Sequence, residues 1–470
     1  MGCNCSDNTN KNIPSEIEEK INNHPCYSEG AHHHYARIHV PVAPACNIQC
    51  NYCNRKYDCS NESRPGVTSE KLKPIDAIKK VLYVGSEIKQ LSVVGIAGPG
   101  DALANPKQTF ETLELLREYA PDLKLCISTN GLELEKYVDK LIELGVEHVT
   151  VTINSLDAEV ASKIYAWIYD RENKRKIKGV EGAKYLIERQ LRGIQKCVEN
   201  GLLVKANSVL IPEINREELT NVSKKLKEMG VFLHNIMPLL SKPEYGTKFS
   251  KDGVKSATYK ELEAVQESCG VDMKLMKHCR QCRADAVGLI GEDRSEDFTK
   301  ERVDSYSMSE LIKIYNVAER VETHEKIEQF RGALKEANKR IEREKELGLK
   351  TIKVAVTSSE KEMINLHFGS AKEFLIYEAG EKGVKFLQNR KVDTPYCSGP
   401  ENCDGTNPIE HIKQNLSDID ILLTAKIGDC PQKELSEINL KTDESYAYEP
   451  IKESVLKATR EFLKIENEAN

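Results

Sequence analysis

The chain has 470 residues, of which 39% are hydrophobic and 30% are charged, and its formal net charge is −6. This length allows two or three domains. No apolar run approaches the roughly 18 residues of a membrane span and no signal peptide is recognisable, which predicts a cytoplasmic protein without a membrane partner. The negative charge argues against nucleic acid as the main partner, because phosphate binding usually requires a basic patch. Fifteen cysteines in a reducing compartment are more natural as metal ligands or core residues than as disulfides.

Residues 1–35 form a polar N-terminal segment with several metal-capable side chains. Cys3 and Cys5 are best explained as part of a disordered leader. His24 and Cys26 stand two residues apart, shortly before a cysteine-rich loop, and Pro25 stiffens the chain between them. The pair is therefore a candidate for holding one metal.

From Ala36 onward, strand patterns alternate with helical patterns. The predicted strands are 36–43, 90–97, 124–128, 148–154, 203–211 and 232–240. The predicted helices between them are 74–84, 106–119, 133–144, 183–200 and 217–229, with a longer insertion before 183–200. Six such units within residues 36–300 predict an α/β fold whose parallel sheet curves into an incomplete (βα) barrel.

The loop after the first predicted strand carries Cys46, Cys50 and Cys53 in the spacing C-x3-C-x2-C. Three thiolates on one short loop can hold three irons of a [4Fe–4S] cluster and leave the fourth iron without a protein ligand. S-adenosylmethionine (SAM) can bind that iron, and one electron then breaks a C–S bond of SAM to give a 5'-deoxyadenosyl radical. A zinc site would normally need four ligands in two spaced pairs, and a disulfide would leave one of three crowded thiols unused.

Unusual residues recur where the predicted strands end. These positions are the cysteine loop, Gly98 to Asp101, Ser128 to Gly131, Asn154–Ser155, Asn207–Ser208 and Asn235 to Pro238. In barrels of this kind the chemistry lies on loops at the carboxyl ends of the strands. Six such features in succession predict one active rim.

Five further residues are candidate metal ligands on or near this rim: His24, Cys26, Cys126, Cys279 and Cys282. Cys126 has a buried core position as its alternative, and the C-x2-C spacing of Cys279 and Cys282 is also found in redox pairs. Cys59, Cys197 and Cys269 are interpreted as structural or exposed thiols. Two permanently held four-iron clusters would need eight ligands, so five ligands indicate clusters that are held weakly enough to leave.

Residues 301–350 are densely charged with helical periodicity, which predicts a solvated helical linker. A chain ending near residue 300 is therefore expected to fold and to keep the whole rim. Residues 351–470 predict a second, small α/β domain, with strands at 353–357, 374–378 and 419–424. Its metal-capable residues are His367, Cys397, Cys403 and Cys430, for which packing or incidental thiols are the favoured interpretation.

Several of these segments resemble the NifB family, the radical SAM proteins of nitrogenase cofactor assembly. The resemblance covers residues 24 to about 290, and the matching runs are 24–30, 32–37, 44–59, 61–66, 95–101, 128–131 and 279–285. Residues from 351 onward resemble the NifX-type domain of nitrogenase cofactor carriers. The resemblance implies fusion of two further [4Fe–4S] clusters, with a SAM-derived carbide and an extra sulfide, into an [8Fe–9S–C] precursor of the iron-molybdenum cofactor.

The resemblance also implies a role for each site residue. Cys46, Cys50 and Cys53 would hold the radical cluster, and His24, Cys26, Cys126, Cys279 and Cys282 the precursor clusters. Tyr52 would flank SAM, Gly98, Pro99, Gly100 and Asp101 would hold its methionyl amino group, and Ser128, Asn130, Asn154, Asn207 and Met237 would line its adenosyl part. Glu62 and Arg64 would handle protons and, with Cys126, form the catalytic set.

The implied partners are an iron–sulfur cluster donor and downstream scaffold or carrier proteins of the cofactor pathway. Two rival classes stay open at this point. A different radical SAM enzyme with auxiliary clusters, acting on a peptide, would show the same radical loop with extra cysteines. A non-catalytic cluster scaffold or carrier is suggested by the NifX-type domain.

Overall fold

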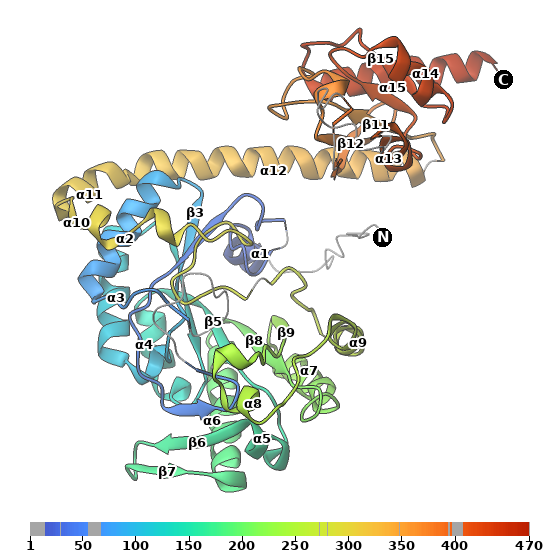
Figure 1. Ribbon diagram of the computed structural model, residues 1–470. Helices are drawn as coiled ribbons and strands as arrows, with labels where there is room; N and C mark the ends of the chain where they lie inside the picture. The colour runs from blue at the N-terminus through green and yellow to red at the C-terminus, as the bar shows by residue number, and fades with distance from the viewer. Residues whose placement is uncertain are drawn as a thin grey trace. The chain divides into compact units, whose positions relative to one another are not determined.

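A computed structural model describes residues 15–28, 30–54, 67–271, 273–279, 281–346, 348–392, 395–396 and 408–469. The chain forms two compact units, Met1–Glu325 and Lys326–Asn470 (Figure 1), which are described separately below. No helix in the described ranges is long and apolar enough to cross a membrane.

The first unit is built on a seven-stranded sheet with the order β10-β1-β3-β4-β5-β8-β9. Six strands run parallel: β1 (Ala36–His39), β3 (Leu91–Ile96), β4 (Lys124–Thr129), β5 (Val146–Thr152), β8 (Leu203–Leu210) and β9 (Leu233–Pro238). β10 (Val287–Gly288) joins β1 in the antiparallel direction. β9 and β10 lie at opposite edges of the sheet, so the barrel is open and the predicted fold class is confirmed.

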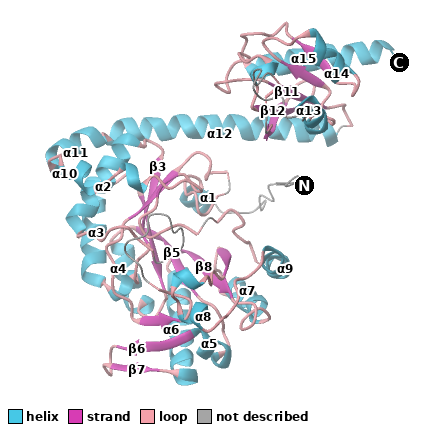
Figure 2. Cartoon of the chain, in the orientation of Figure 1, coloured by secondary structure: helices cyan, strands magenta, loops and turns pink. Residues whose placement is uncertain are grey.

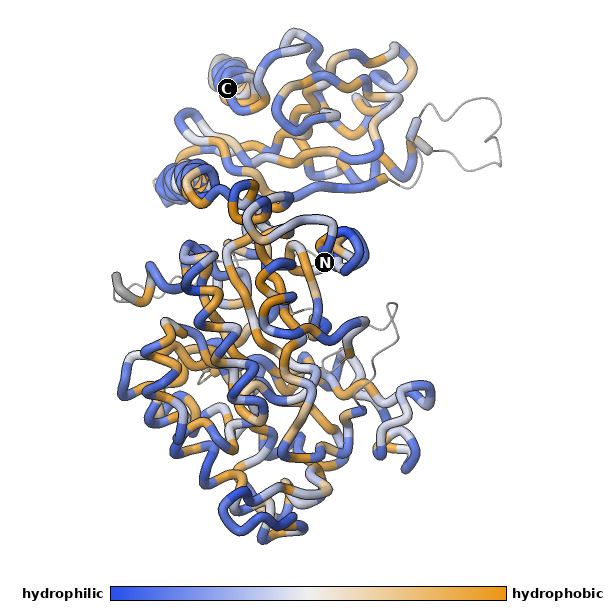
Figure 3. The backbone as a smooth tube through the Cα atoms, turned by 90° about the vertical axis from the view of Figure 1, so that its left-hand side faces the viewer, coloured by the Kyte–Doolittle hydropathy of each residue, from blue (hydrophilic) through white to orange (hydrophobic). Residues whose placement is uncertain are grey.

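Helices follow the strands and cover the sheet. They are α2 (Pro74–Glu87), α3 (Pro106–Tyr119), α4 (Leu134–Glu143), α6 (Gly179–Glu199), α7 (Glu218–Glu228) and α9 (Tyr259–Gly270), with the short α1 (Ser15–Ile21), η1 (Ala102–Ala104), η2 (Pro243–Tyr245), α8 (Lys248–Lys251) and η3 (Ser295–Asp297). Hydrophobic and hydrophilic residues alternate along these helices (Figure 3), and their apolar faces bury one large cluster and several smaller ones against the sheet. In α4, for example, Val138 and Leu141 are buried.

The insertion between β5 and α6 forms α5 (Ala158–Ile164), β6 (Tyr165–Asp170) and β7 (Arg175–Ile177). β6 and β7 make a hairpin, visible in Figure 2 apart from the strands of the main sheet. β6 also pairs with β2 (Ile48–Cys50), which is part of the cysteine loop. A second, three-stranded sheet thus supports this loop from outside the barrel.

Residues 301–350 were predicted to be a solvated linker, but the first half of this segment packs against the first unit. It forms α10 (Lys300–Asp304), α11 (Met308–Tyr315) and α12 (Val317–Glu346). Leu311 and Tyr315 are buried in the core of the first unit, and the Arg320 guanidinium is completely buried against Asp122. Residues up to 325 therefore belong to the first unit.

The second unit has a five-stranded sheet with the order β13-β12-β11-β14-β15. Its strands are β11 (Ile352–Val356), β12 (Glu373–Ala379), β13 (Val384–Lys391), β14 (Ile421–Leu423) and β15 (Lys441–Asp443). Its helices are η4 (Phe368–Ser370), α13 (Pro408–Asn415), α14 (Asp429–Ser436) and α15 (Ile451–Ala469). Two apolar clusters, one with α15 and one with α13 and α14, cover alternate residues of β11, so the sheet has a core on each face.

Candidate active site: a cavity lined by seven cysteines

The open barrel encloses a cavity of ≈ 280 Å³. Seven of its lining residues are the cysteines that the sequence singled out: Cys26, Cys46, Cys50, Cys53, Cys126, Cys279 and Cys282. They come from four segments of the chain, namely the segment before β1, the cysteine loop, β4 and the segment before β10. The fold therefore brings together thiols that are far apart in sequence.

The cysteine loop is held in place by backbone contacts on both sides. The N–H of Asn51 donates to the carbonyl of Ile164 at 2.8 Å, and β2 pairs with β6. On the other side, the N–H of Gly100 donates to the Ala43 carbonyl at 2.7 Å, and the N–H of Asp101 donates to the Ala45 carbonyl at 2.8 Å. Such contacts order the three thiols before any ligand binds.

Gly100 is required by this close approach. A Cβ atom at position 100 would lie 2.1 Å from the carbonyl oxygen of Ala45. Because the obstacle is backbone, a side chain there would have to push the cysteine loop away from the loop after β3. The glycine thus allows the two loops to contact each other.

The buried carboxylate of Asp101 links two neighbouring segments, the loop after β3 and the end of β4. One oxygen accepts the N–H groups of Leu103 and Ala104 at 2.9 and 3.0 Å. The other accepts the Asn130 N–H at 2.6 Å and the Thr129 hydroxyl at 3.0 Å. Asp101 is 3% exposed, and burial raises its pKa despite these donors. Since its lone pairs are engaged, Asp101 acts as a clamp between the loops after β3 and β4.

Asn130 extends this clamp to the cysteine loop. Its amide nitrogen donates to the side-chain oxygen of Asn47 at 2.7 Å and lies 3.8 Å from the sulfur of Cys46. Its side-chain oxygen accepts the N–H of Leu132 at 2.9 Å. The position of the Cys46 thiol is consequently coupled to the ends of β3 and β4.

The structure separates the residues predicted to bind SAM into two groups. Those that line the cavity are Tyr52, Pro99, Gly100, Asp101, Ser128, Asn130, Asn207 and Met237. Gly98 and Asn154 are not among the lining residues. The Asn154 amide donates to the hydroxyls of Tyr52 and Tyr165 at 3.0 Å each, and its oxygen accepts the Val209 N–H at 2.8 Å. Asn154 therefore orients Tyr52 from behind.

The four cysteines outside the loop are half-buried, as are the three cysteines of the loop. Burial raises the pKa of Cys26, and it raises the pKa of Cys126 to about 12. Asn235 donates to the sulfur of Cys279 at 3.2 Å, and Arg37 donates to the sulfur of Cys282 at 3.3 Å. Binding of iron at these thiols would displace their protons.

Two histidines line the cavity, and their hydrogen bonds differ. Nδ1 of His24 accepts the N–H of Cys26 at 3.2 Å, so the proton of the neutral ring is on Nε2, which has no partner among the described residues. Nδ1 of His39 lies 2.8 Å from the carbonyl of Arg283, an acceptor only, so this ring is protonated at Nδ1 and keeps its Nε2 lone pair. A ligating imidazole usually donates its other N–H in this way. The geometry favours His39 over the predicted His24 as a metal ligand.

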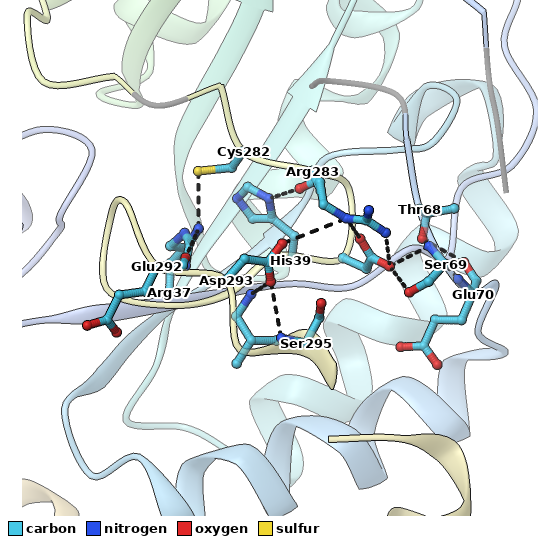
Figure 4. A network of polar contacts seen from close by, with 12 residues as sticks. Arg37, His39, Thr68, Ser69, Glu70, Cys282, Arg283, Glu292, Asp293 and Ser295 are labelled. Atoms are coloured by element: carbon cyan, nitrogen blue, oxygen red, sulfur yellow. Dashed lines mark hydrogen bonds and ion pairs between the residues drawn. The ribbon is translucent and has the colours of Figure 1, made fainter. Parts of the chain in front are cut away.

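Two buried cations also line the cavity. Figure 4 shows Arg37 reaching towards Cys282 and the Glu292 carbonyl; it also donates to the carbonyl of Gly288 at 2.6 Å. Lys205 is 8% exposed, and although burial lowers its pKa, the four nearby cysteines raise it above the usual value overall. The cavity therefore presents positive charge to whatever its thiols bind.

Comparisons with known proteins identify the family of the chain and of each unit. The Radical SAM superfamily matches residues 40–226, and the family described as dinitrogenase iron-molybdenum cofactor matches residues 350–461. The FeMo cofactor biosynthesis protein NifB of Herbaspirillum seropedicae is 48% identical over 467 residues, which covers 98% of this chain and 86% of that protein. The chain belongs to the NifB family. The FeMo cofactor biosynthesis protein NifB of Azotobacter vinelandii is 45% identical, covering 96% of this chain and 90% of that protein.

Among solved structures, the one described as native anSMEcpe with bound AdoMet and Cp18Cys peptide aligns over 60% of this chain and 80% of its own. The sequence identity is 15% and the TM-score is 0.35. Membership of the NifB family confirms the resemblance inferred from the motifs. As a radical SAM family, it implies a [4Fe–4S] cluster and SAM, and the three loop thiols that line the cavity fit this group.

Several predicted residues lie outside the described ranges: Cys3, Cys5, Cys59, Glu62, Arg64, Cys397 and Cys403. Cys197 and Cys269 are buried, as predicted for structural thiols, and Cys430 is exposed. Among the described residues, no three His, Cys, Asp or Glu side chains converge closely enough to hold a single metal ion.

Three basic side chains that line this NifB-family site, those of Arg37, His39 and Lys205, were not among the predicted site residues. His39 was detectable as a polar residue at the end of β1, directly before the cysteine loop. Lys205 was detectable as a charge inside a buried strand, because lysine is almost never fully buried without a reason.

Proposed function

We propose that this chain fuses two [4Fe–4S] clusters, with a carbide derived from the methyl group of SAM and one additional sulfide, to give the [8Fe–9S–C] precursor of the iron-molybdenum cofactor. The observation that carries the proposal is the single cavity lined by seven cysteines. Three of them belong to the C-x3-C-x2-C loop, and four lie outside it. This division supports one resident cluster next to substrate clusters.

The resident group would be held by Cys46, Cys50 and Cys53. When bound, the cluster and SAM supply one-electron cleavage of a C–S bond of SAM. The protein orders the thiols of this loop through Asp101 and Asn130. Tyr52, oriented by Asn154, would flank SAM.

The substrate clusters would be held by Cys26, Cys126, Cys279 and Cys282 together with one histidine. The hydrogen bonds of His39 support that residue as the ligand in place of His24. Five ligands are fewer than the eight that two permanent clusters would use. Substrate clusters held in this way can combine and leave. Glu62 and Arg64 stay candidates for proton handling.

The second unit matches a family named for the cofactor, and a role in holding or handing over the product is proposed for it. Its partners would be a cluster donor upstream and cofactor scaffold or carrier proteins downstream.

The test changes Cys279 and Cys282 to Ala in the full chain. Two of five substrate-cluster ligands are then lost, so iron content should fall by about one cubane. SAM binding and formation of 5'-deoxyadenosine should persist, because the cysteine loop and the Asp101 clamp are unchanged. Carbon from labelled SAM methyl should no longer enter an iron–sulfur product. Cys430→Ala, an exposed cysteine of the second unit, is the matched control.

Full iron loading with normal carbon incorporation in the double variant would show that these cysteines are not ligands. Label appearing in a peptide instead of a cluster would favour a peptide-modifying enzyme. Absence of 5'-deoxyadenosine from the reduced parent protein would favour a scaffold or carrier.

A further inference from the structure

The β6–β7 hairpin is attached directly to the strand that carries the cysteine loop. β2 pairs with β6 in the antiparallel direction, with Ile48 opposite Ile168 and Gln49 opposite Trp167. Ile48 and Ile168 are also buried in one apolar cluster. The hairpin therefore has a fixed position relative to the cysteines of the loop, and none of the roles described above uses it.

A groove beside this hairpin shares one residue with the cavity. The groove has a volume of ≈ 260 Å³, and its lining residues include Cys46, Trp167, Tyr169, Arg171 and Lys176. Cys46 also lines the cavity inside the barrel. The cysteine loop is thus the wall between the outer groove and the active site. A redox centre seated at the groove would lie close to the thiolates that hold the resident cluster.

The hairpin has a net positive charge although the whole chain has a net charge of −6. Residues 165–178 contain five basic residues and two acidic residues, Asp170 and Glu172. Glu172 pairs with Arg189, and Arg175 pairs with Glu181 at 3.1 Å. Lys174, Lys176 and Lys178 are exposed, and within the part of the chain that the structure describes none of them forms an ion pair.

Aromatic side chains accompany these charges at the groove. The ammonium group of Lys176 lies over the ring of Trp167, 4.3 Å from its centre. Arg171 donates to the carbonyl of Ala104 at 2.8 Å, which places a guanidinium at the opposite side of the groove. Aromatic residues and arginine next to exposed lysines are a composition typical of protein interfaces with charge steering.

We infer that this hairpin and groove form the docking site for a small acidic one-electron carrier protein. One electron leaves the reduced carrier, which is oxidised, and this electron is consumed in the reductive cleavage of the C–S bond of SAM, which gives methionine and a 5'-deoxyadenosyl radical. The inference rests on radical SAM chemistry and not on the proposed fusion of clusters. Positive charge on the hairpin would attract the carrier, and the thin loop wall would keep the electron path short.

The test compares two full-length charge-reversal variants. Lys176→Glu with Lys178→Glu changes the hairpin, and Lys224→Glu with Lys227→Glu makes the same change in net charge on exposed residues of α7. Binding of a reduced plant-type two-iron ferredoxin is measured by calorimetry at low and high salt. The hairpin variant should bind at least roughly tenfold more weakly than the α7 variant at low salt, and the difference should shrink at high salt.

A second readout separates docking from damage to the active site. Formation of 5'-deoxyadenosine driven by the ferredoxin should fall in the hairpin variant, whereas formation driven by dithionite should be the same in all three proteins. Equal ferredoxin binding by the two variants would overturn the inference. The inference would also be overturned if the parent protein did not bind the ferredoxin. It would likewise be overturned if the hairpin bound short duplex DNA more tightly than it bound the ferredoxin.

Discussion

The segment from residue 301 to 325 should be essential for folding of the first unit. Leu311 and Tyr315 are 0% and 1% exposed, and Val303 is 4% exposed. Burying three such side chains stabilises a fold by roughly 5–9 kcal/mol, at about 1.5–3 kcal/mol each. The total stability of a domain is about 5–15 kcal/mol. A chain that ends at residue 300 should therefore lose most of its stability, although it contains every residue of the cavity.

Arg320 adds a polar contribution to the same contact. Its guanidinium donates to Asp122 at 2.8 Å and to the carbonyls of Gly85 and Leu91, and Tyr315 donates to Asp122 at 2.7 Å. Removing one partner of a buried ion pair costs about 3–5 kcal/mol, because the other charge stays buried. Arg320→Met should destabilise the full chain by about that amount.

The assay is equilibrium unfolding in urea of chains that end at residues 300 and 325. The longer chain should unfold cooperatively, since it retains Leu311, Tyr315 and Arg320. The shorter chain should be aggregated or unfold at much lower urea concentration. Equal unfolding midpoints for the two chains would refute the assignment of residues 301–325 to the core of the first unit.

Three other substitutions test the site. Gly100→Ala should lower the iron content and SAM affinity of the cysteine loop, measured by iron analysis and calorimetry, because the new Cβ meets the Ala45 carbonyl at 2.1 Å. Lys205→Met should keep SAM binding but lower the retention of substrate clusters on desalting, since a buried cation is lost. Asp285→Asn should reduce the unfolding free energy by about 3 kcal/mol, because the buried Arg283 loses its nearer carboxylate partner, at 3.0 Å, and keeps only Asp293 at 3.7 Å. Burial opposes ionisation of Asp285, but Arg283 and Ser69 lower its pKa overall, so this stabilisation is present above pH 3.8 and is lost as the pH falls through the lowered pKa.

The barrel was predictable because its strands are continuous apolar segments next to amphipathic helices. The predicted strands 90–97 and 148–154 correspond to β3 and β5 within about two residues. The β6–β7 hairpin was not predicted, because β6 pairs with β2, a short strand far upstream whose sequence is dominated by cysteine spacing. Pairing between distant segments leaves little local signal.

The buried residues within 301–325 were not predicted, because the composition of residues 301–350 is dominated by charged side chains. Leu311 and Tyr315 are four residues apart and share one side of α11, while Arg320 contributes a charge that composition alone assigns to solvent. Burial of Arg320 depends on Asp122 and on backbone carbonyls of other segments. The sequence of the helix contains none of these partners.

The cysteines of the site were identifiable from the sequence because a thiol can bind metal wherever it lies in a fold. A polar residue in a strand does not, because its role depends on the face on which it lies and on its neighbours. The Arg283 carbonyl accepts from Nδ1 of His39, which leaves Nε2 of that ring as a candidate metal ligand. The carboxylate of Asp101 accepts N–H groups from two loops, which gives it a structural role. Hydrogen bonds between distant segments decided both cases.

The buried cations give a physical reason for the low number of ligands. Iron–sulfur clusters with thiolate ligands are anionic, and transfer of an isolated charge into a protein interior is unfavourable without compensation. On the proposed function, Lys205 and Arg37 would supply that compensation without forming bonds to iron. On the proposed function, a substrate cluster would thus be retained partly by charge and partly by a few thiolates, and only the thiolate bonds would have to break when the product leaves.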